Sequence, residues 1–450
     1  MAETTPAADI ATTSVPLNTV AVAQGDGHYH AAIHALSQRL VRAQKPIRIL
    51  DAVQWDDSIR QQFFAARCAR LPQLDADHYQ RHRPLRFNLD HKRQELHALE
   101  RDLMRQLGQL NPIGALLRRQ CREYLLVIEM LAARGTPHFA QLSQELYGAS
   151  SDVFHAGDPT VAELADRLQV VLQQLIVQSP AINAPQKSFD AAEAVHWLNQ
   201  RLRKQFPGCG VRARLDDGIV ADAAAGSDTI KLRADASFSL SDLRMLEAHE
   251  GWVHVGTSLN GARQPICTFL AKGPPSATIT QEGLAVMTET LSMHSTPFRL
   301  ARLTRRVQAV ARAEDGADLI ELYRYLIEQG ESADDAWQLC YRVFRGSWAD
   351  AGPFTKDLSY IKGFVLVFNY LRLCIMRGSP ERFHLLFCGK TTIDDIKTIA
   401  ALAADGTVAP PHYLPPLFED LNGLSACLSF TRFASALDFS QLERDYSTVF

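Results

Sequence analysis

The chain lacks several features that would name a chemistry at once. None of its eight cysteines forms a CxxC pair, so thiolate zinc sites and thioredoxin-type redox chemistry are not expected. No block of Lys and Arg stands out, and the formal net charge is only −3, which argues against a nucleic-acid partner. The apolar stretch at residues 364–376 is too short to span a bilayer and contains Arg372. We therefore expect a buried helix there and no membrane partner.

The first 27 residues offer little to bury. They are rich in Ala, Thr and Pro, which predicts a disordered tail over residues 1–27. They also lack the basic start and the apolar core of a signal peptide. Together with scattered cysteines that are typical of reduced, buried thiols, this predicts a cytoplasmic location.

The pattern of apolar and turn residues divides the rest of the chain into regions. Apolar residues recur at helical spacing through residues 28–185, which predicts a helical N-terminal region. A Pro- and Ala-rich stretch at 179–185 ends that region as a linker, and residues 186–450 are the predicted catalytic domain. Short segments at 211–215, 218–223 and 229–234, separated by turn residues, predict two or three strands. The predicted fold class is α+β, mainly α-helical, with a small sheet before the helix that carries the histidines.

The sequence His249-Glu250-Gly251-Trp252-Val253-His254 places two imidazoles around a carboxylate. Ser239 begins the helix that contains it, because its hydroxyl can cap free backbone amides. Five residues of regular α-helix would leave the two histidine side chains roughly 140° apart. We therefore predict an over-wide, π-helical turn between His249 and His254. Gly251 weakens the α-helix at that point.

Glu282 is the best candidate for a third metal ligand. It lies near the predicted start of the next helix, with Thr280 as a candidate cap. Catalytic zinc takes three protein ligands and keeps one position open. Glu250 then serves as the base for a water that the metal acidifies, and Glu289, two turns after Glu282, orients a ligand histidine.

These residues resemble a known family, the QEGLA-motif proteins, described in bacteria as flavohaemoglobin-expression-modulating proteins. Their eukaryotic relatives are the microtubule-associated tyrosine carboxypeptidases, zinc enzymes that remove the C-terminal tyrosine of α-tubulin. The resemblance covers roughly residues 190–380. The matching phrases are His249-Glu250-xxx-His254, Asn260-Gly261, Gln281-Glu282-Gly283-Leu284-Ala285, Arg345-Gly346 and Lys356-Asp357-xx-Tyr360-xx-Gly363.

The resemblance implies a zincin-like core that holds one Zn²⁺ on His249, His254 and Glu282, with Glu250 as the catalytic base. It also implies a peptide or protein C-terminal tail as substrate. The extended basic regions expected of a microtubule binder are missing from the sequence, so tubulin is not the expected substrate. The oligomeric state is left open.

A carboxypeptidase needs a cation for the terminal carboxylate of its substrate, preferably a bidentate arginine. Arg342, Arg345 and Lys356 are the candidates, although a solvated helix charge is the commoner role for any one of them. Tyr360 is a candidate donor to the oxyanion, with a core tyrosine as the alternative. Residues 227–234 are a candidate edge strand for pairing with an extended peptide.

The function predicted from the sequence is that of a zinc-dependent peptidase, first of all a carboxypeptidase. One alternative is an endopeptidase or aminopeptidase that uses the same site. Another is a regulatory protein that binds zinc without catalysis. The phrase Gly389-Lys390-Thr391 lacks the first glycine of a phosphate-binding loop, and we interpret Thr391 or Thr392 as a helix cap.

Overall fold

The computed structural model describes residues 24–216, 218–219, 221–350, 352–434 and 439–445. Within these residues helices predominate and one three-stranded sheet is present. The predicted mainly helical α+β class is therefore confirmed. The predicted tail at 1–27 lies largely outside the described residues, and its last four residues belong to the first helix, which begins at Gln24.

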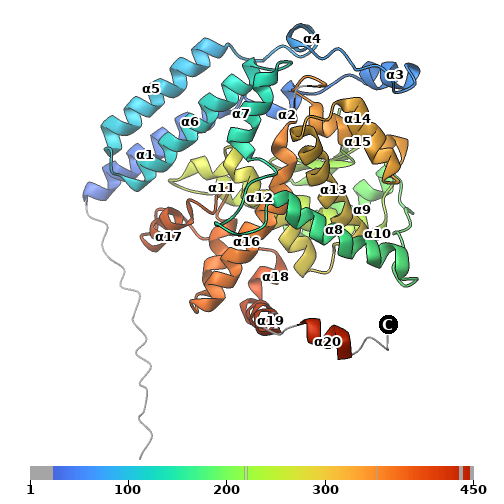
Figure 1. The fold of residues 1–450 in the computed structure, drawn as a ribbon. Helices are drawn as coiled ribbons and strands as arrows, with labels where there is room; N and C mark the ends of the chain where they lie inside the picture. The colour runs from blue at the N-terminus through green and yellow to red at the C-terminus, as the bar shows by residue number, and fades with distance from the viewer. Residues whose placement is uncertain (1–23, 217, 220, 351, 435–438, 446–450) are drawn as a thin grey trace, which may run out of the picture.

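Helices α1, α5 and α6 lie side by side at one side of the molecule, whereas α3 and α8 lie apart from them (Figure 1). Asn111 caps α6 by accepting a hydrogen bond from the backbone N–H of Gly114, and Pro112 occupies the first turn, where its missing N–H costs nothing. The helices of this part are α1 (Gln24–Gln44), α2 (Ile49–Ala52), α3 (Asp57–Ala65), α4 (Ala76–His82), α5 (Leu89–Leu107), α6 (Pro112–Ala132), α7 (Pro137–Tyr147) and α8 (Val161–Gln178).

A small sheet follows helix α9 (Ala191–Gln205). Its strand order is β1-β3-β2, with β1 and β3 parallel and β2 and β3 antiparallel. The strands are β1 (Arg212–Leu215), β2 (Ala223–Ala225) and β3 (Thr229–Leu232). The expectation that residues 227–234 form an edge strand is wrong, because β3 is paired on both sides. The second strand also begins later than predicted, at Ala223, and it lies at an edge of the sheet.

The helix with the histidines is one continuous rod made of three segments. They are α10 (Leu240–Leu246), the π-helical segment η1 (Glu247–Val255) and α11 (Gly256–Ala262). Ser239 and Asp242 form the capping box at its start, as the sequence predicted. The predicted over-wide turn between His249 and His254 is confirmed, and it extends over nine residues.

The remaining helices surround the long pair α12 and α16, which cross near the centre of the molecule (Figure 1). The segments are η2 (Thr268–Ala271), α12 (Pro275–Leu291), α13 (Pro297–Glu314), α14 (Leu319–Glu328), α15 (Ala333–Phe344), η3 (Thr355–Leu358), α16 (Ser359–Met376), η4 (Pro380–Phe387), α17 (Ile396–Ala404), α18 (Pro416–Glu419), α19 (Leu421–Ala434) and α20 (Phe439–Asp445).

The helix α16 and its preceding turn, Thr355–Met376, are long and apolar enough to cross a membrane by length and composition alone. It is the only such helix among the described residues. Its Val367 and Leu371 side chains are fully buried, and it packs along α12. This is the buried helix that the sequence predicted at residues 364–376.

The hydrophobic cores join the two halves of the chain. One core combines Leu96 and Leu117 of the N-terminal helices with Leu270 and Leu402. A second core, similarly, combines N-terminal aromatic residues with side chains of α12, α13 and α15. The predicted boundary at residues 185–186 therefore does not separate two cores, and the N-terminal helices support the elements that carry the site.

Candidate metal centre and its cleft

Three potential metal ligands converge where η1 meets α12. The donor atoms of His249, His254 and Glu282 all lie within 4.8 Å of one another. Glu282 Oε2 is 3.2 Å from His249 Nε2 and 3.6 Å from His254 Nε2. Donors bound to one zinc ion at ~2.1 Å in a tetrahedron would lie about 3.4 Å apart. The spacing and the donor types, two imidazole nitrogens and one carboxylate oxygen, both fit a catalytic zinc ion.

The π-helical segment brings the two histidines to one face of the rod. Their ring centroids are 4.8 Å apart, with the ring planes at 81°, so each ring points a nitrogen towards Glu282. Gly251 lies inside the segment, but a Cβ at this position would meet its nearest neighbours, on Gln205 and Leu202, at 3.4 Å. The space around Gly251 therefore does not itself require glycine.

Glu282 is held in place by a close helix crossing and by one cation. The next residue, Gly283, packs directly on the backbone of Gly363 in α16. Lys356 Nζ donates to Glu282 Oε1 at 3.4 Å. Burial by itself would raise the pKa of Glu282, but Lys356 and the two histidines outweigh it and hold that pKa well below its usual value. Glu282 is therefore an ionised donor.

A buried carboxylate fixes the orientation of His249 from behind. Glu289 Oε1 accepts from His249 Nδ1 at 2.5 Å, and Arg299 donates to both oxygens of Glu289 at 3.1 and 3.2 Å. The side chain of Glu289 is fully buried. Burial would raise its pKa, yet Arg299 and His249 lower it to about 2. The predicted role of Glu289 in orienting a ligand fits this geometry, while Arg299 was missed.

The protonation of His249 reflects these two carboxylates. Burial by itself lowers the pKa of His249, but hydrogen bonds to Glu282 and Glu289 outweigh burial and raise it to about 10. In the metal-free protein both ring nitrogens of His249 therefore carry hydrogen at neutral pH. A metal ion would take the place of the proton on Nε2, because a ligand imidazole must offer a lone pair.

A cavity of about 120 Å³ opens beside the donor cluster. His249, Glu250 and Tyr360 line it. The Tyr360 ring stacks on the His249 ring, with centroids 6.3 Å apart and planes at 28°. Glu250 therefore faces this cavity beside the donor cluster.

This small cavity continues into an outer cleft of about 830 Å³. The two spaces share six lining residues, so they form one path from solvent to the donor cluster. The flank of β2 forms one side of the junction and α13 forms another. The shared residues are Lys187, Ala221, Asp222, Arg302, Arg306 and Arg342.

The three cations predicted to bind substrate have different positions. Arg342 lines the cleft but donates bidentately to Asp357 at 2.5 and 2.7 Å. Lys356 contacts Glu282, as described above. Arg345 is buried against the rings of Tyr341 and Phe354 and does not line the cleft. The structure therefore does not bring these three together as one carboxylate site.

Arg306 is the cation that the sequence analysis missed. It projects from α13, and its guanidinium lies 4.9 Å from the ring centroid of Tyr360. Its buried Nε has no hydrogen-bond partner among the described residues. Burial and the nearby Arg342 lower the pKa of Arg306 to about 10, so it stays charged at neutral pH. The spacing of Arg299, Arg302 and Arg306, three and four residues apart on one helix face, is the signal that points to it.

Lys390 is a second residue whose position the sequence did not reveal. Its Nζ donates to the backbone oxygen of His254 at 2.9 Å and to Gln281 Oε1 at 2.9 Å, and it lies 3.0 Å from Thr257 Oγ1. Lys390 thus links the end of η1 to Gln281, the residue before Glu282.

The sequence predicted Thr391 or Thr392 as a helix cap near this point. In the structure Thr392 Oγ1 accepts a hydrogen bond from the backbone N–H of Asp395, so the predicted cap is close to the observed one.

Comparisons with known proteins identify a family for this chain. A model of the family described as microtubule-associated tyrosine carboxypeptidase matches residues 61–436. A comparison with curated proteins found no match. The matched span includes the donor cluster, most of the residues that line the cleft and most of the N-terminal helices. The chain therefore belongs to the microtubule-associated tyrosine carboxypeptidase family.

Proposed function

We propose that the protein is a zinc-dependent carboxypeptidase that removes C-terminal residues from peptides or proteins. Family membership supports a carboxypeptidase activity. The observation that carries the proposal is Arg306, which lines the same cavity as Glu250 and whose Nε has no hydrogen-bond partner among the described residues. The terminal carboxylate of a peptide would supply an acceptor for this group beside the reacting groups.

Zinc held by His249, His254 and Glu282 would supply Lewis acidity to the substrate carbonyl and to water. Glu250 accepts the proton of the attacking water and passes it to the leaving amine. Tyr360 donates a hydrogen bond to the oxygen of the carbonyl under attack. Glu289, held by Arg299, keeps the His249 ring in one orientation through these steps.

The substrate chain would leave the site along β2. This strand lies at the edge of the sheet, and Ala221, Asp222 and Ala223 line the inner cavity. An extended peptide can add to such an edge through main-chain hydrogen bonds. A sheet edge beside a helix that carries two histidines and a base supports the zincin-like description of the core.

We propose a peptide or protein tail as the substrate class and the cytoplasm as the place of action. All eight cysteines are free thiols in the structure, which suits a reducing compartment. Tyrosine and microtubules belong to the description of the family.

The test is a digest of paired peptides that differ only in a free or an amidated C-terminus, read by mass spectrometry with zinc-loaded protein. A carboxypeptidase shortens the free peptides from the C-terminus and spares the amidated ones. Equal cleavage of both would instead show an endopeptidase or aminopeptidase. Less than about a tenth of an equivalent of zinc after reconstitution would refute the metal centre itself, because a catalytic site binds one ion.

A further inference from the structure

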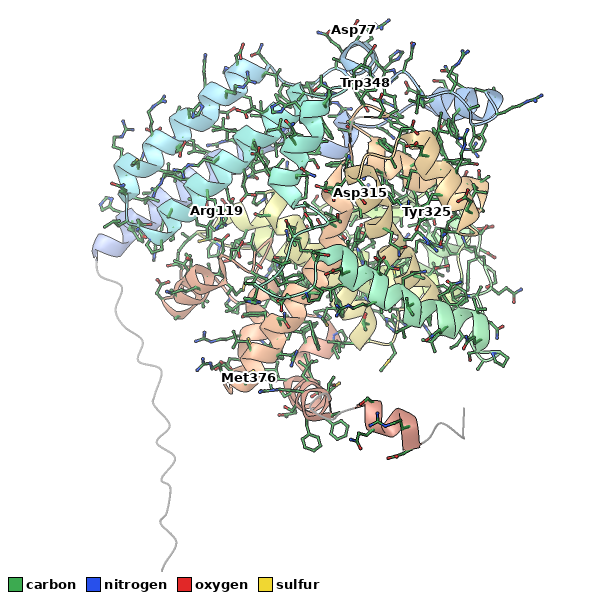
Figure 2. All side chains as sticks on the ribbon, in the orientation of Figure 1. Asp77, Arg119, Asp315, Tyr325, Trp348 and Met376 are labelled. Atoms are coloured by element: carbon green, nitrogen blue, oxygen red, sulfur yellow. The ribbon has the colours of Figure 1, made fainter. Side chains whose placement is uncertain are left out.

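A second cavity lies apart from the metal centre, between α16, η4 and α17. Its volume is about 940 Å³, near the upper end of the range for small-molecule sites. Its walls are mostly aliphatic, with Leu366 and Leu373 from α16 and Ile396 and Ala400 from α17. It shares no lining residue with the cleft at the metal centre. Figure 2 labels Met376, which ends α16 on this side of the molecule.

The mouth of this cavity carries positive charge only. Arg377, Arg382 and Lys397 line it and are exposed, and no acidic residue is among the lining residues. Within the part of the chain that the structure describes, none of the three forms an ion pair. Glu381 is adjacent in sequence and exposed, but it lies outside the lining. The cavity thus combines apolar walls with three cations that form no ion pair among the described residues.

Two of the polar side chains that line the cavity, Tyr370 and Cys374, lie on α16 and are uncharged. The Tyr370 hydroxyl donates to the backbone oxygen of Arg382 at 2.8 Å, which ties α16 to η4 and closes one wall. Burial raises the pKa of Tyr370 and that of Cys374, so both side chains stay uncharged at neutral pH. The interior therefore offers apolar contact and little hydrogen bonding to a ligand.

We propose that this cavity binds an amphipathic anion of the fatty-acid class. The aliphatic chain would lie on Leu366, Leu373 and Ile396, where burial of each CH₂ is favourable. The carboxylate would pair with Arg377 or Arg382 at the mouth through charge-assisted hydrogen bonds. A short anion would leave the apolar walls in water, and a neutral hydrocarbon would leave the cations unused. This site is independent of the proposed peptidase activity.

The first test is isothermal titration of the full-length protein with sodium laurate below its micelle concentration. We expect saturable binding of one laurate. Dodecanol, which has the same chain and no charge, should bind about tenfold more weakly because it lacks the charge-assisted bonds. Absence of saturable binding, or adsorption of many laurate molecules, would overturn the proposal. Association only with anionic vesicles would also overturn it, because it would identify a membrane surface instead.

Three variants locate the site. Ala400→Phe should place a ring in the apolar part of the cavity and weaken laurate binding. The double variant Arg377→Gln/Arg382→Gln should weaken laurate about tenfold and leave dodecanol unchanged. Arg372→Gln is the control, because Arg372 lies on the same helix over the Phe368 ring and does not line the cavity. If Arg372→Gln weakened laurate as much as the double variant, the proposal would be wrong.

Folding of each variant is checked by circular dichroism and a thermal melt. The two arginines at the mouth are exposed, so their replacement leaves the core intact. They therefore keep the proposal testable even if Ala400→Phe disturbs the packing of α17. If the folded double variant bound laurate with unchanged affinity, Arg377 and Arg382 would not bind the carboxylate, and the proposal would be wrong.

Discussion

Gly283 and Gly363 touch at the crossing of α12 and α16. A Cβ added to Gly283 would lie 2.0 Å from the carbonyl carbon of Gly363, and one added to Gly363 would lie 1.9 Å from the backbone oxygen of Ile279. No side chain fits there unless the two helices move apart. Because Glu282 precedes Gly283, the same contact sets the position of the carboxylate donor.

The variant Gly283→Ala should therefore lose both stability and metal. We expect a loss of about 1–3 kcal/mol in the free energy of unfolding, the usual cost of overpacking, measured by urea denaturation. Zinc affinity should fall as well, because α12 must shift with Glu282 on it. Gly27→Ala is the control, since a Cβ at Gly27 in α1 meets nothing within 4 Å; it should be neutral or slightly stabilising.

Glu250→Gln should separate catalysis from metal binding. Glu250 lines the cavity but is not part of the donor cluster. We expect kcat/KM on a free-tailed peptide to fall about 10²–10⁴-fold, the usual contribution of a general base. Zinc content by mass spectrometry should stay at one equivalent. If a cellular role survives this change with metal bound, the protein acts as a zinc-containing regulator rather than as a peptidase.

Arg306→Gln should slow the cleavage of peptides that have a free C-terminal carboxylate. Loss of a charge-assisted contact costs about 1.5–3 kcal/mol, which is about 10- to 100-fold in kcat/KM for a peptide with a free carboxylate. Residual cleavage of an amidated peptide should not change further. Arg312→Gln serves as the control, because Arg312 lies on the same helix against Tyr325, away from the cleft. Equal losses in both variants would exclude a specific carboxylate contact.

Binding of zinc should release a proton from His249. The pKa of this side chain is raised to about 10 in the metal-free protein, so it is protonated at pH 7.5 and must give up the Nε2 proton to bind metal. Calorimetry of zinc binding in buffers of different ionisation enthalpy should show about one proton released per ion. No proton release would mean that His249 is neutral before the metal arrives.

The raised pKa of His249 also predicts how the stability of the metal-free protein changes with pH. The pKa of His249 is 6.5 in the unfolded chain and about 10 in the folded protein, so protonated His249 stabilises the folded state. This stabilisation is complete below pH 6.5 and is lost as the pH rises towards 10. The metal-free protein should therefore lose stability between pH 6.5 and 10, as measured by urea unfolding at several pH values. In the zinc-loaded protein this residue should contribute no such slope over the same interval.

Glu289→Gln should weaken zinc binding without removing a ligand. The carboxylate contacts His249 from the side opposite to Glu282, and replacing such a partner typically costs 10- to 100-fold in metal affinity. Competition with a fluorescent chelator measures the change. Glu145→Gln is a control on exposed helix surface and should leave the affinity unchanged.

The parts of the site that could be predicted are those set by local sequence. The five-residue spacing of His249 and His254 requires a π-helical turn if both are to reach one ion, and the structure contains it. Arg306 and Lys390 were missed for a different reason. Arg306 reaches Tyr360 because α13 packs against α16. Lys390 reaches the backbone oxygen of His254 because the segment after η4 returns to the end of η1. The arginine spacing on α13 indicates a shared helix face, but these two tertiary contacts cannot be derived from the sequence.

The sequence predicted that strands would form in this region, but it did not predict the order of the strands in the sheet. Turn residues mark where each strand ends, whereas pairing depends on tertiary contacts. In the structure, residues 229–232 form the central strand, and the three alanines at 223–225 form an edge strand.

The π-helical segment amounts to one extra residue inserted into an otherwise regular helix. The five-residue interval and the wide turn compensate each other, so neither can change alone. Deleting one residue between Gly251 and Val253 would let the rod close into an α-helix and keep the histidines together at an interval of four. The helix after His254 would keep its phase, so the Asn260 side chain would still meet the backbone oxygens of Phe387 and Tyr413 that it now binds. Closing the wide turn without removing a residue would instead rotate His254 and Asn260 together by roughly 100° about the helix axis. The π-helical segment therefore maintains two arrangements at once, the pair of histidines and the distant contacts of Asn260.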